Sequence, residues 1–218
     1  MIVRTTQSSP TRTTVDILST YAIIIKRPAS SAVELHRLVH LTIRNYLQER
    51  GLFHQWNQEA ISILAETFPS ASHENRSKWR RLLPHAKYAL ANSSVEQGSD
   101  STISLAVKYA IALYQDGHFN DAEKLFVQVM ETSKTKLGAD HPSTLTSMNN
   151  LAFTWKGQGR LKEALDLMKE CCFLSTRKLG PEHQYTISSI AASRVWQQEQ
   201  DSQHVRNDMH SNVRISQK

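Results

Sequence analysis

Residues 117–123 read GHFNDAE, and forty-two residues later residues 159–165 read GRLKEAL. A second pair of words, LGADH at residues 137–141 and LGPEH at residues 179–183, has the same spacing. Recurrence of two separate words at one period is typical of stacked-repeat proteins. The sequence therefore predicts a repeat array, and it favours a protein that holds partners over one that makes or breaks bonds.

Apolar spacing and helix breakers predict two helices in each repeat. We expect helices over residues 101–116, over a segment that Asn120 or Asp121 caps, and over residues 143–156, 161–178 and 185–198. The side-chain oxygens of Asn120 and Asp121 can accept from free amides at a helix start. Gly138 suits the left-handed position after a helix, and Pro142 suits the first turn of the next one.

The part before the repeats has a different pattern. Residues 21–25 predict a short strand that pairs with residues 32–35 as a hairpin. Three helices are expected: one that His36 opens and Gly51 ends, one over residues 56–68, and one over residues 79–90, in which Pro84 marks a start or a kink. The predicted organisation is a disordered leader (1–12), a winged-helix-like helical segment (13–97), about two and a half repeats (98–199), and a disordered or frayed tail (200–218).

Composition narrows the class of protein. The 39% apolar content, with 7 Gly and 6 Pro in 218 residues, favours a mainly all-α fold, and no apolar run is long enough for a membrane span. The net charge is +6, but residues 101–200 hold eleven Lys or Arg against ten Asp or Glu. A nearly neutral repeat region argues against a nucleic-acid groove. The adjacent Cys171 and Cys172 exclude a disulfide framework and favour a reducing, cytoplasmic compartment. One or both are expected to be small core residues of a helix.

Catalytic motifs are missing from the sequence. It contains no GxSxG, no HExxH and no patterned pair of carboxylates, so no enzyme, cofactor or metal site is expected. His36 and His40 stand one helical turn apart, but no third metal ligand with suitable spacing accompanies them. His141 and His183 hold the same repeat position, which favours a loop-capping role.

A basic cluster surrounds Trp79 and consists of Arg76, Lys78, Arg80 and Arg81. Basic residues beside an aromatic ring can bind nucleic acid, but a solvent-exposed helix face is the favoured interpretation of this cluster.

The repeated words resemble the tetratricopeptide repeat, in the forty-two-residue form of kinesin light chains and many fungal repeat proteins. Ala164 matches the small residue of the second helix, Ala152 that of the first helix, and Trp155 the large residue between them. In the first unit these positions are held by Ala122, Ala110 and Leu113. Small residues let two helices approach closely, and the large one fills the gap.

In that family the first helix of each unit faces a concave, peptide-binding groove. The resemblance implies a groove lined by Ser104, Val107, Ile111, Tyr114, Gln115, Thr146, Asn149, Asn150, Phe153 and Lys156, with Ala191 and Val195 following in the third unit. Side-chain amides both donate and accept, as an extended peptide backbone requires. Asn149 and Asn150 therefore either bind a peptide or bond neighbouring helices of the array.

The upstream half resembles the segment between nucleotide-binding domain and repeats in fungal NLR-like (STAND) proteins. The residues that carry this resemblance are HRLVHL at 36–41, Trp56, FP at 68–69, Trp79 and LLPHA at 82–86. The chain has no GxxxxGK[ST], so ATP binding is not carried over.

The leading hypothesis is a non-enzymatic scaffold that binds a protein or peptide in the concave face of its repeats. The alternatives are a regulatory fragment of an NLR-like protein without its nucleotide-binding domain, nucleic-acid binding through the basic N-terminal half, and a decaying gene product.

Overall fold

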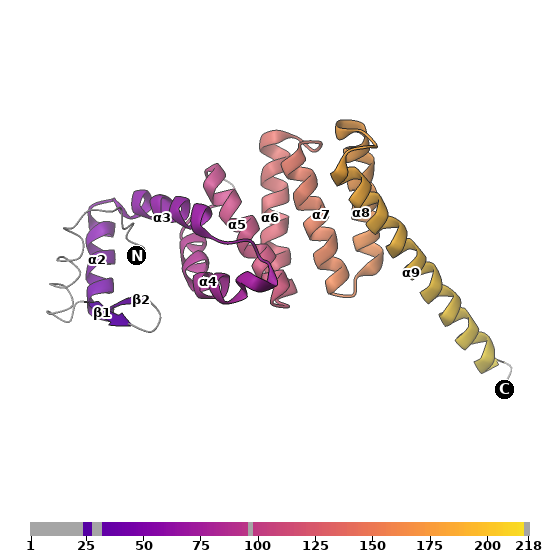
Figure 1. Cartoon of the computed structure of the whole chain (residues 1–218), viewed down its shortest axis with the longest axis horizontal. Helices are drawn as coiled ribbons and strands as arrows, with labels where there is room; N and C mark the ends of the chain where they lie inside the picture. Colours follow the sequence, from indigo (N-terminus) through magenta and orange to yellow (C-terminus); the bar gives the residue numbers. More distant parts are fainter. Residues whose placement is uncertain (1–23, 28–31, 96–97, 216–218) are drawn as a thin grey trace. The chain divides into compact units, whose positions relative to one another are not determined.

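The computed structural model describes residues 24–27, 32–95 and 98–215 (Figure 1). The chain divides into two compact units, Met1–Ile63 and Leu64–Lys218. The boundary predicted near residue 98 therefore falls within the second unit, whereas the predicted leader, residues 1–12, lies outside the described residues.

The first unit contains a β-hairpin and a helix. Strand β1 (Ile24–Arg27) pairs antiparallel with β2 (Ala32–Leu35), with Ile24 opposite Leu35. The first strand includes Lys26 and Arg27, which the sequence placed after the strand. Helix α2 (Arg37–Glu49) begins after His36, whose Nδ1 accepts from the amide of Leu38 at 3.3 Å. Helix α3 (Phe53–Thr67) spans the boundary between the units.

The second unit opens with a short 3-10 turn, η2 (His73–Asn75), and helix α4 (Arg76–Ala91). Pro84 lies inside α4, so the predicted helix start at Pro84 is wrong. Proline costs this helix one backbone donor. Packing offsets the loss, because Trp79, Ala86, Ala89 and Leu90 are all buried.

Five helices form the repeat array. They are α5 (Asp100–Gln115), α6 (Phe119–Leu137), α7 (Pro142–Gly157), α8 (Leu161–Leu179) and α9 (Gln184–Ile215). Each packs against the next in sequence, and Figure 1 shows the helices from α5 to α8 standing side by side. The helices α5, α7 and α9 begin at positions separated by forty-two residues, as the repeated words predict. The mainly helical fold is thereby confirmed. No helix in the described ranges has the length and apolar character that a membrane crossing needs.

Small residues set the helix spacing within each unit. Ala110 and Ala122 are both fully buried in the first unit, as Ala152 and Ala164 are in the second. Ala152 and Ala164 belong to one apolar cluster, which Trp155 packs against. The sequence predicted this pairing of small and large positions, and close helix packing explains why it recurs.

Glycine makes the turn inside each complete unit. Gly117 and Gly159 both have φ of +82°, a conformation that L side chains rarely adopt. The chain then enters α6 with His118 as the capping residue and without a side-chain cap. The predicted caps at Asn120 and Asp121 are wrong, because the glycine turn delivers the chain into the helix at Phe119.

The third unit lacks such a turn. Position 201, which corresponds to Gly117 and Gly159, is Asp201, and α9 continues through it to Ile215. The predicted helix over residues 185–198 is thus part of a 32-residue helix, which continues into the segment 200–218 that was predicted to be a disordered or frayed tail. Aspartate adopts the left-handed backbone conformation of this turn less readily than glycine does, which agrees with a helix that continues through position 201.

Candidate functional site

The predicted groove residues lie along one face of successive first helices. On α5 and α7 they stand at intervals of three and four residues, which places them on one side of each helix. We call this surface the first-helix face. It comprises Ser104, Val107, Ile111 and Tyr114 on α5, Thr146, Asn149, Phe153 and Lys156 on α7, and Ser188, Ala191 and Val195 on α9. Gln115 is exposed and Asn150 is half-buried; both lie directly beside this face.

An apolar row crosses the face at equivalent repeat positions. Ile111 is half-buried, Phe153 is 37% exposed and Val195 is 58% exposed. The Phe153 ring meets the buried Trp196 ring edge-on, with 4.9 Å between the ring centroids. This row leaves apolar surface available that the core does not use.

The asparagine pair lies in the middle of the first-helix face. Among the residues that the structure describes, no side-chain hydrogen bond joins Asn149 or Asn150 to a neighbouring helix, and the Oδ1 atom of Asn149 is buried without a partner. Of the two roles that the sequence left open, the bond to neighbouring helices is therefore absent here. A buried acceptor without a partner is costly.

Two other residues of the face are already engaged within the chain. Lys156 Nζ pairs with Glu199 at 2.8 Å and lies 5.4 Å from the centroid of the Trp196 ring. The Tyr114 ring packs edge-on against Phe119, with centroids 5.4 Å apart. These contacts hold the two side chains in place on the face.

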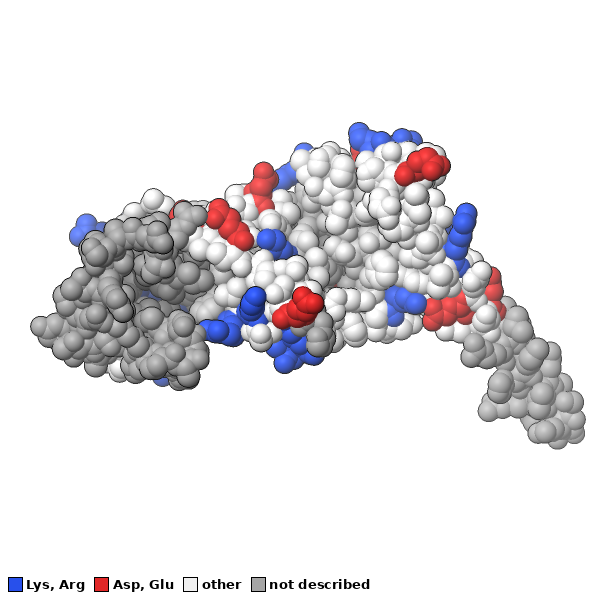
Figure 2. Space-filling model, viewed as in Figure 1, with Lys and Arg blue, Asp and Glu red and all other residues white. Residues whose placement is uncertain are grey.

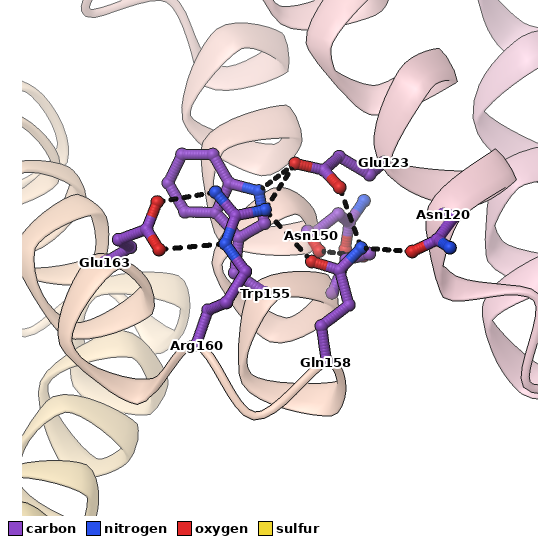
Figure 3. A network of polar contacts seen from close by, with 8 residues as sticks. Asn120, Glu123, Asn150, Trp155, Gln158, Arg160 and Glu163 are labelled. Carbon is purple, nitrogen blue, oxygen red and sulfur yellow. Dashed lines mark hydrogen bonds and ion pairs between the residues drawn. The ribbon is translucent and has the colours of Figure 1, made fainter.

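Glu123 connects the two repeat units through a polar network, shown in Figure 3. Its carboxylate accepts from Trp155 Nε1 at 2.6 Å, from Gln158 Nε2 at 2.7 Å and from Arg160 Nη1 at 2.7 Å. Arg160 also pairs with Glu163 and stacks over the Trp155 ring at 4.8 Å. We call this network the Glu123 joint, because it ties α6 of one unit to the turn of the next.

Electrostatics in the joint favour the charged form of each partner. Partial burial alone would raise the pKa of Glu123, but hydrogen bonds from Gln158, Arg160 and Trp155 outweigh it and lower the pKa. The bond with Arg160 likewise lowers the pKa of Glu163. The charged groups of the network all have hydrogen-bond partners within the protein. We therefore interpret the Glu123 joint as a structural connection between repeat units.

The basic cluster on α4 forms a second joint. Asp116 accepts from Arg80 at 2.6 Å and from Arg76 at 2.8 Å, and these bonds lower the pKa of its carboxyl. Trp79 is 1% exposed, and its indole donates to the Ser72 carbonyl. The aromatic ring is therefore not available to stack on a base. Figure 2 also shows few charges across the middle of the visible repeat face.

The recurring histidines cap helices. His141 Nδ1 accepts from the amide of Ser143, and His183 Nδ1 accepts from the amide of Tyr185, each at 3.2 Å. The predicted loop-capping role is confirmed by this geometry. Within the described ranges, no group of three or more metal-ligating side chains is assembled.

The cysteines lie where α8 meets its neighbours. Cys171 is buried beside Leu145 and the Tyr185 hydroxyl, and Cys172 is half-buried. Burial raises the pKa of both thiols, that of Cys172 to about 11. A raised pKa leaves little thiolate at neutral pH, so both side chains behave as small core residues.

A surface cavity of about 530 Å³ lies at the turn between α5 and α6. Its lining residues are Gly117, His118, Phe119, Asn120, Asp121, Lys124 and Gln158. None of them belongs to the predicted groove. The repeated word at residues 117–123 marks this turn in the sequence, but it carries no signal for a cavity.

Comparisons with known proteins agree with this architecture. Residues 101–172 match the family model described as tetratricopeptide repeat. A nucleotide-binding leucine-rich repeat (NLR)-like protein of Hyaloscypha variabilis is 32% identical over 133 residues, which is 61% of this chain. The chain spans 13% of that relative's length. Both resemblances drawn from the sequence, to the repeat and to an NLR-like protein, are thus confirmed.

Solved structures support the fold. A putative kinesin light chain with nearly identical TPR-like repeats from Podosopora anserina matches with a TM-score of 0.50 at 18% identity, covering 78% of this chain and 91% of that one. BtubC (BKLC) from P. vanneervenii matches with a TM-score of 0.50 at 16% identity, over 72% of this chain and 61% of that one. At such identities the likeness concerns the fold alone.

Proposed function

We propose, for a chain whose residues 101–172 carry tetratricopeptide repeats, that its first-helix face binds an extended segment of a partner protein. Repeats of this kind generally mediate protein–protein interactions, and the chain is accordingly a helical-repeat interaction scaffold. The proposal adds to this role the place where the partner lies, which is the first-helix face. The observation that carries it is the set of exposed or unpartnered side chains that recurs on this face every forty-two residues.

The chemistry of the face suits a peptide with apolar side chains. Ile111, Phe153 and Val195 supply a row of apolar surface, while the core takes the opposite side of each helix. Burial of such surface stabilises a complex by roughly 25 cal/mol per Å² before the costs of association are subtracted. A ligand with an apolar side chain at intervals could lie along this row.

Polar groups on the face suit the backbone of that peptide. The Oδ1 atom of Asn149 is a buried acceptor without a partner among the described residues, and it would accept from a peptide amide once the side chain turns toward the surface. Such a bond would remove the cost of leaving that acceptor buried and unpaired. It requires no particular side chain from the ligand, which favours recognition by shape and backbone.

A selection experiment tests the location of binding. Peptides selected from a random display library against the full chain should bind at least about tenfold more weakly to Phe153→Ala and Asn149→Ala, since about 1.4 kcal/mol corresponds to that factor. Phe173→Ala is the matched control, because Phe173 is 66% exposed on α8 and lies outside the face. The proposal would be contradicted if all three variants lost the same amount of peptide affinity, or if only Phe173→Ala lost affinity.

A second candidate function rests on the NLR-like relative. Since 133 residues of this chain are 32% identical to part of that protein, the chain could restrain a nucleotide-binding domain supplied by another polypeptide. Co-purification with the nucleotide-binding domain of the Hyaloscypha variabilis protein would test this role. Failure of the two purified proteins to associate would remove this candidate and leave the peptide-binding proposal standing.

A further inference from the structure

Helix α4 carries a concentrated positive charge. Its 16 residues include five Lys or Arg and no Asp or Glu. Four of the five basic residues lie within residues 76–81, so they crowd into the first two turns of the helix. In Figure 2, basic side chains gather over the region where Figure 1 places α4.

These charges are arranged unfavourably for the helix itself. The N-terminus of a helix carries partial positive charge, so acidic residues stabilise the first turn and basic residues destabilise it. The helices α5, α6 and α8 follow this rule, with Asp100, Asp121 and Glu163 in their first turns. The first turn of α4 has no acidic residue, and it contains Arg76 and Lys78. The charges of α4 therefore do not stabilise their own helix.

One carboxylate of the repeat array compensates part of this charge. Asp116 accepts from Arg76 at 2.8 Å and from Arg80 at 2.6 Å. The Arg80 guanidinium contacts both carboxylate oxygens, which is the bidentate geometry in which arginine recognises a carboxylate. The two arginine side chains nevertheless remain 44% and 51% exposed. Helix α4 thus already holds one carboxylate and presents its guanidinium groups to solvent beside it.

Two lysines of the same helix keep their charge uncompensated. Lys78 and Lys87 are exposed, and neither forms an ion pair or a side-chain hydrogen bond with another residue in the described ranges. Lys78 also stands three residues before Arg81, which places like charges side by side on the helix surface. Positive charge is therefore left over on α4 after the chain has folded.

We propose that α4 docks an acidic segment of a partner protein on its exposed basic face. This α4 basic face comprises Arg76, Lys78, Arg80, Arg81 and Lys87. Carboxylates of the segment would pair with the two lysines and would approach the exposed sides of the arginines that hold Asp116. The partner would thereby supply the negative charge that the helix lacks.

Three observations favour an acidic protein over nucleic acid as the occupant. Trp79 is 1% exposed and cannot stack on a base. The basic face is limited to a helix about 24 Å long, whereas residues 101–200 are nearly neutral, so few phosphates could be neutralised. Pro84 is exposed and Tyr88 is 40% exposed one helical turn later, so apolar surface lies among the charges. A protein segment can use such surface for contact, as interfaces rich in Tyr and Arg do.

Charge reversal on α4 tests this docking surface. Fluorescence anisotropy would follow the binding of a labelled oligoglutamate peptide to the full chain. The double variant Lys78→Glu/Lys87→Glu should bind the peptide at least about tenfold more weakly, because each substitution turns an attraction into a repulsion. Thermal melts should show Lys78→Glu to be at least as stable as the native chain, because an acid suits the first turn of a helix. A loss of binding would then not come from unfolding.

A matched control separates the α4 basic face from the overall charge of the protein. Lys134→Glu/Lys162→Glu changes the net charge by the same amount at two exposed lysines of α6 and α8, and it should leave the affinity nearly unchanged. The proposal is overturned if the native chain does not bind oligoglutamate, or if both double variants lose the same affinity. It is also overturned if the α4 substitutions weaken binding of a single-stranded oligothymidylate, or of phosphatidylserine vesicles, more than binding of oligoglutamate. These residues lie outside the first-helix face, so such results would leave the proposed peptide site standing.

Discussion

At the scale of single residues, a few carboxylates connect the repeat units. Asp116 has a side chain only 9% exposed and accepts from two arginines of α4, while Glu123 accepts from three donors of the next unit. Hydrogen bonds to charged groups are stronger than those between neutral groups. These joints therefore fix how one helix pair sits on the next.

Asp116→Asn is expected to lower the free energy of unfolding at pH 7 by about 1–2 kcal/mol, since the arginines are themselves half-exposed. Because the pKa of Asp116 is lowered in the folded state, its contribution is present above the ordinary carboxyl pKa. It is lost as the pH falls through the folded value. Thermal melts from pH 7 to pH 2 should show the difference in melting temperature between native and variant protein narrowing at the acid end of the series.

Asp121→Asn serves as the control for that series. Its side chain is 66% exposed and, within the described ranges, its ion pair is with Lys124 at 3.6 Å, so little change in melting temperature is expected at any pH. A constant difference in melting temperature between Asp116→Asn and the native protein down to pH 2 would show that the lost charge is not the cause.

At the scale of elements, glycine decides where a helix ends. Gly117 and Gly159 turn the chain at φ of +82°, and in unit three Asp201 leaves α9 unbroken. One residue type thus separates two helical hairpins from a single long helix.

Gly159→Ala should destabilise the protein by about 1 kcal/mol, the ordinary cost of forcing a side chain into a left-handed backbone conformation. An added Cβ would meet nothing within 4 Å, so the cost comes from the backbone and not from a clash. Urea unfolding measures it, with the exposed Lys162→Ala as the control. An unchanged midpoint for Gly159→Ala would mean that the turn does not need glycine.

The sequence predicted elements better than contacts, for a physical reason. Helix periodicity, turn glycines and the paired alanines are local signals, and they located α5, α7 and α8 to within one residue at each end. The end of α9 was missed by seventeen residues, because no local signal replaces the turn glycine there. The Glu123 joint brings together residues more than thirty positions apart, so it exists only after the units stack. The burial of Trp79 likewise depends on how α4 packs, which no spacing within its own segment reveals.

At the scale of the whole molecule, the repeat array has a face that the core leaves free, and we propose that partners bind there. One side of α5 and of α7 is buried in the core, and the joints at Asp116 and Glu123 hold the units in register. The row of Ile111, Phe153 and Val195 remains exposed or half-exposed on the other side. A rigid scaffold with a recurring free face is what a peptide-binding repeat protein requires.

Site-specific photo-crosslinking tests that central claim most directly. A photoreactive phenylalanine analogue would replace Phe153 on the first-helix face, or Phe173 on α8 as the matched control. After illumination with a peptide selected against the full chain, mass spectrometry would locate the crosslinks. The account predicts crosslinks from position 153 and none from position 173. Crosslinks from position 173 with none from position 153 would contradict it.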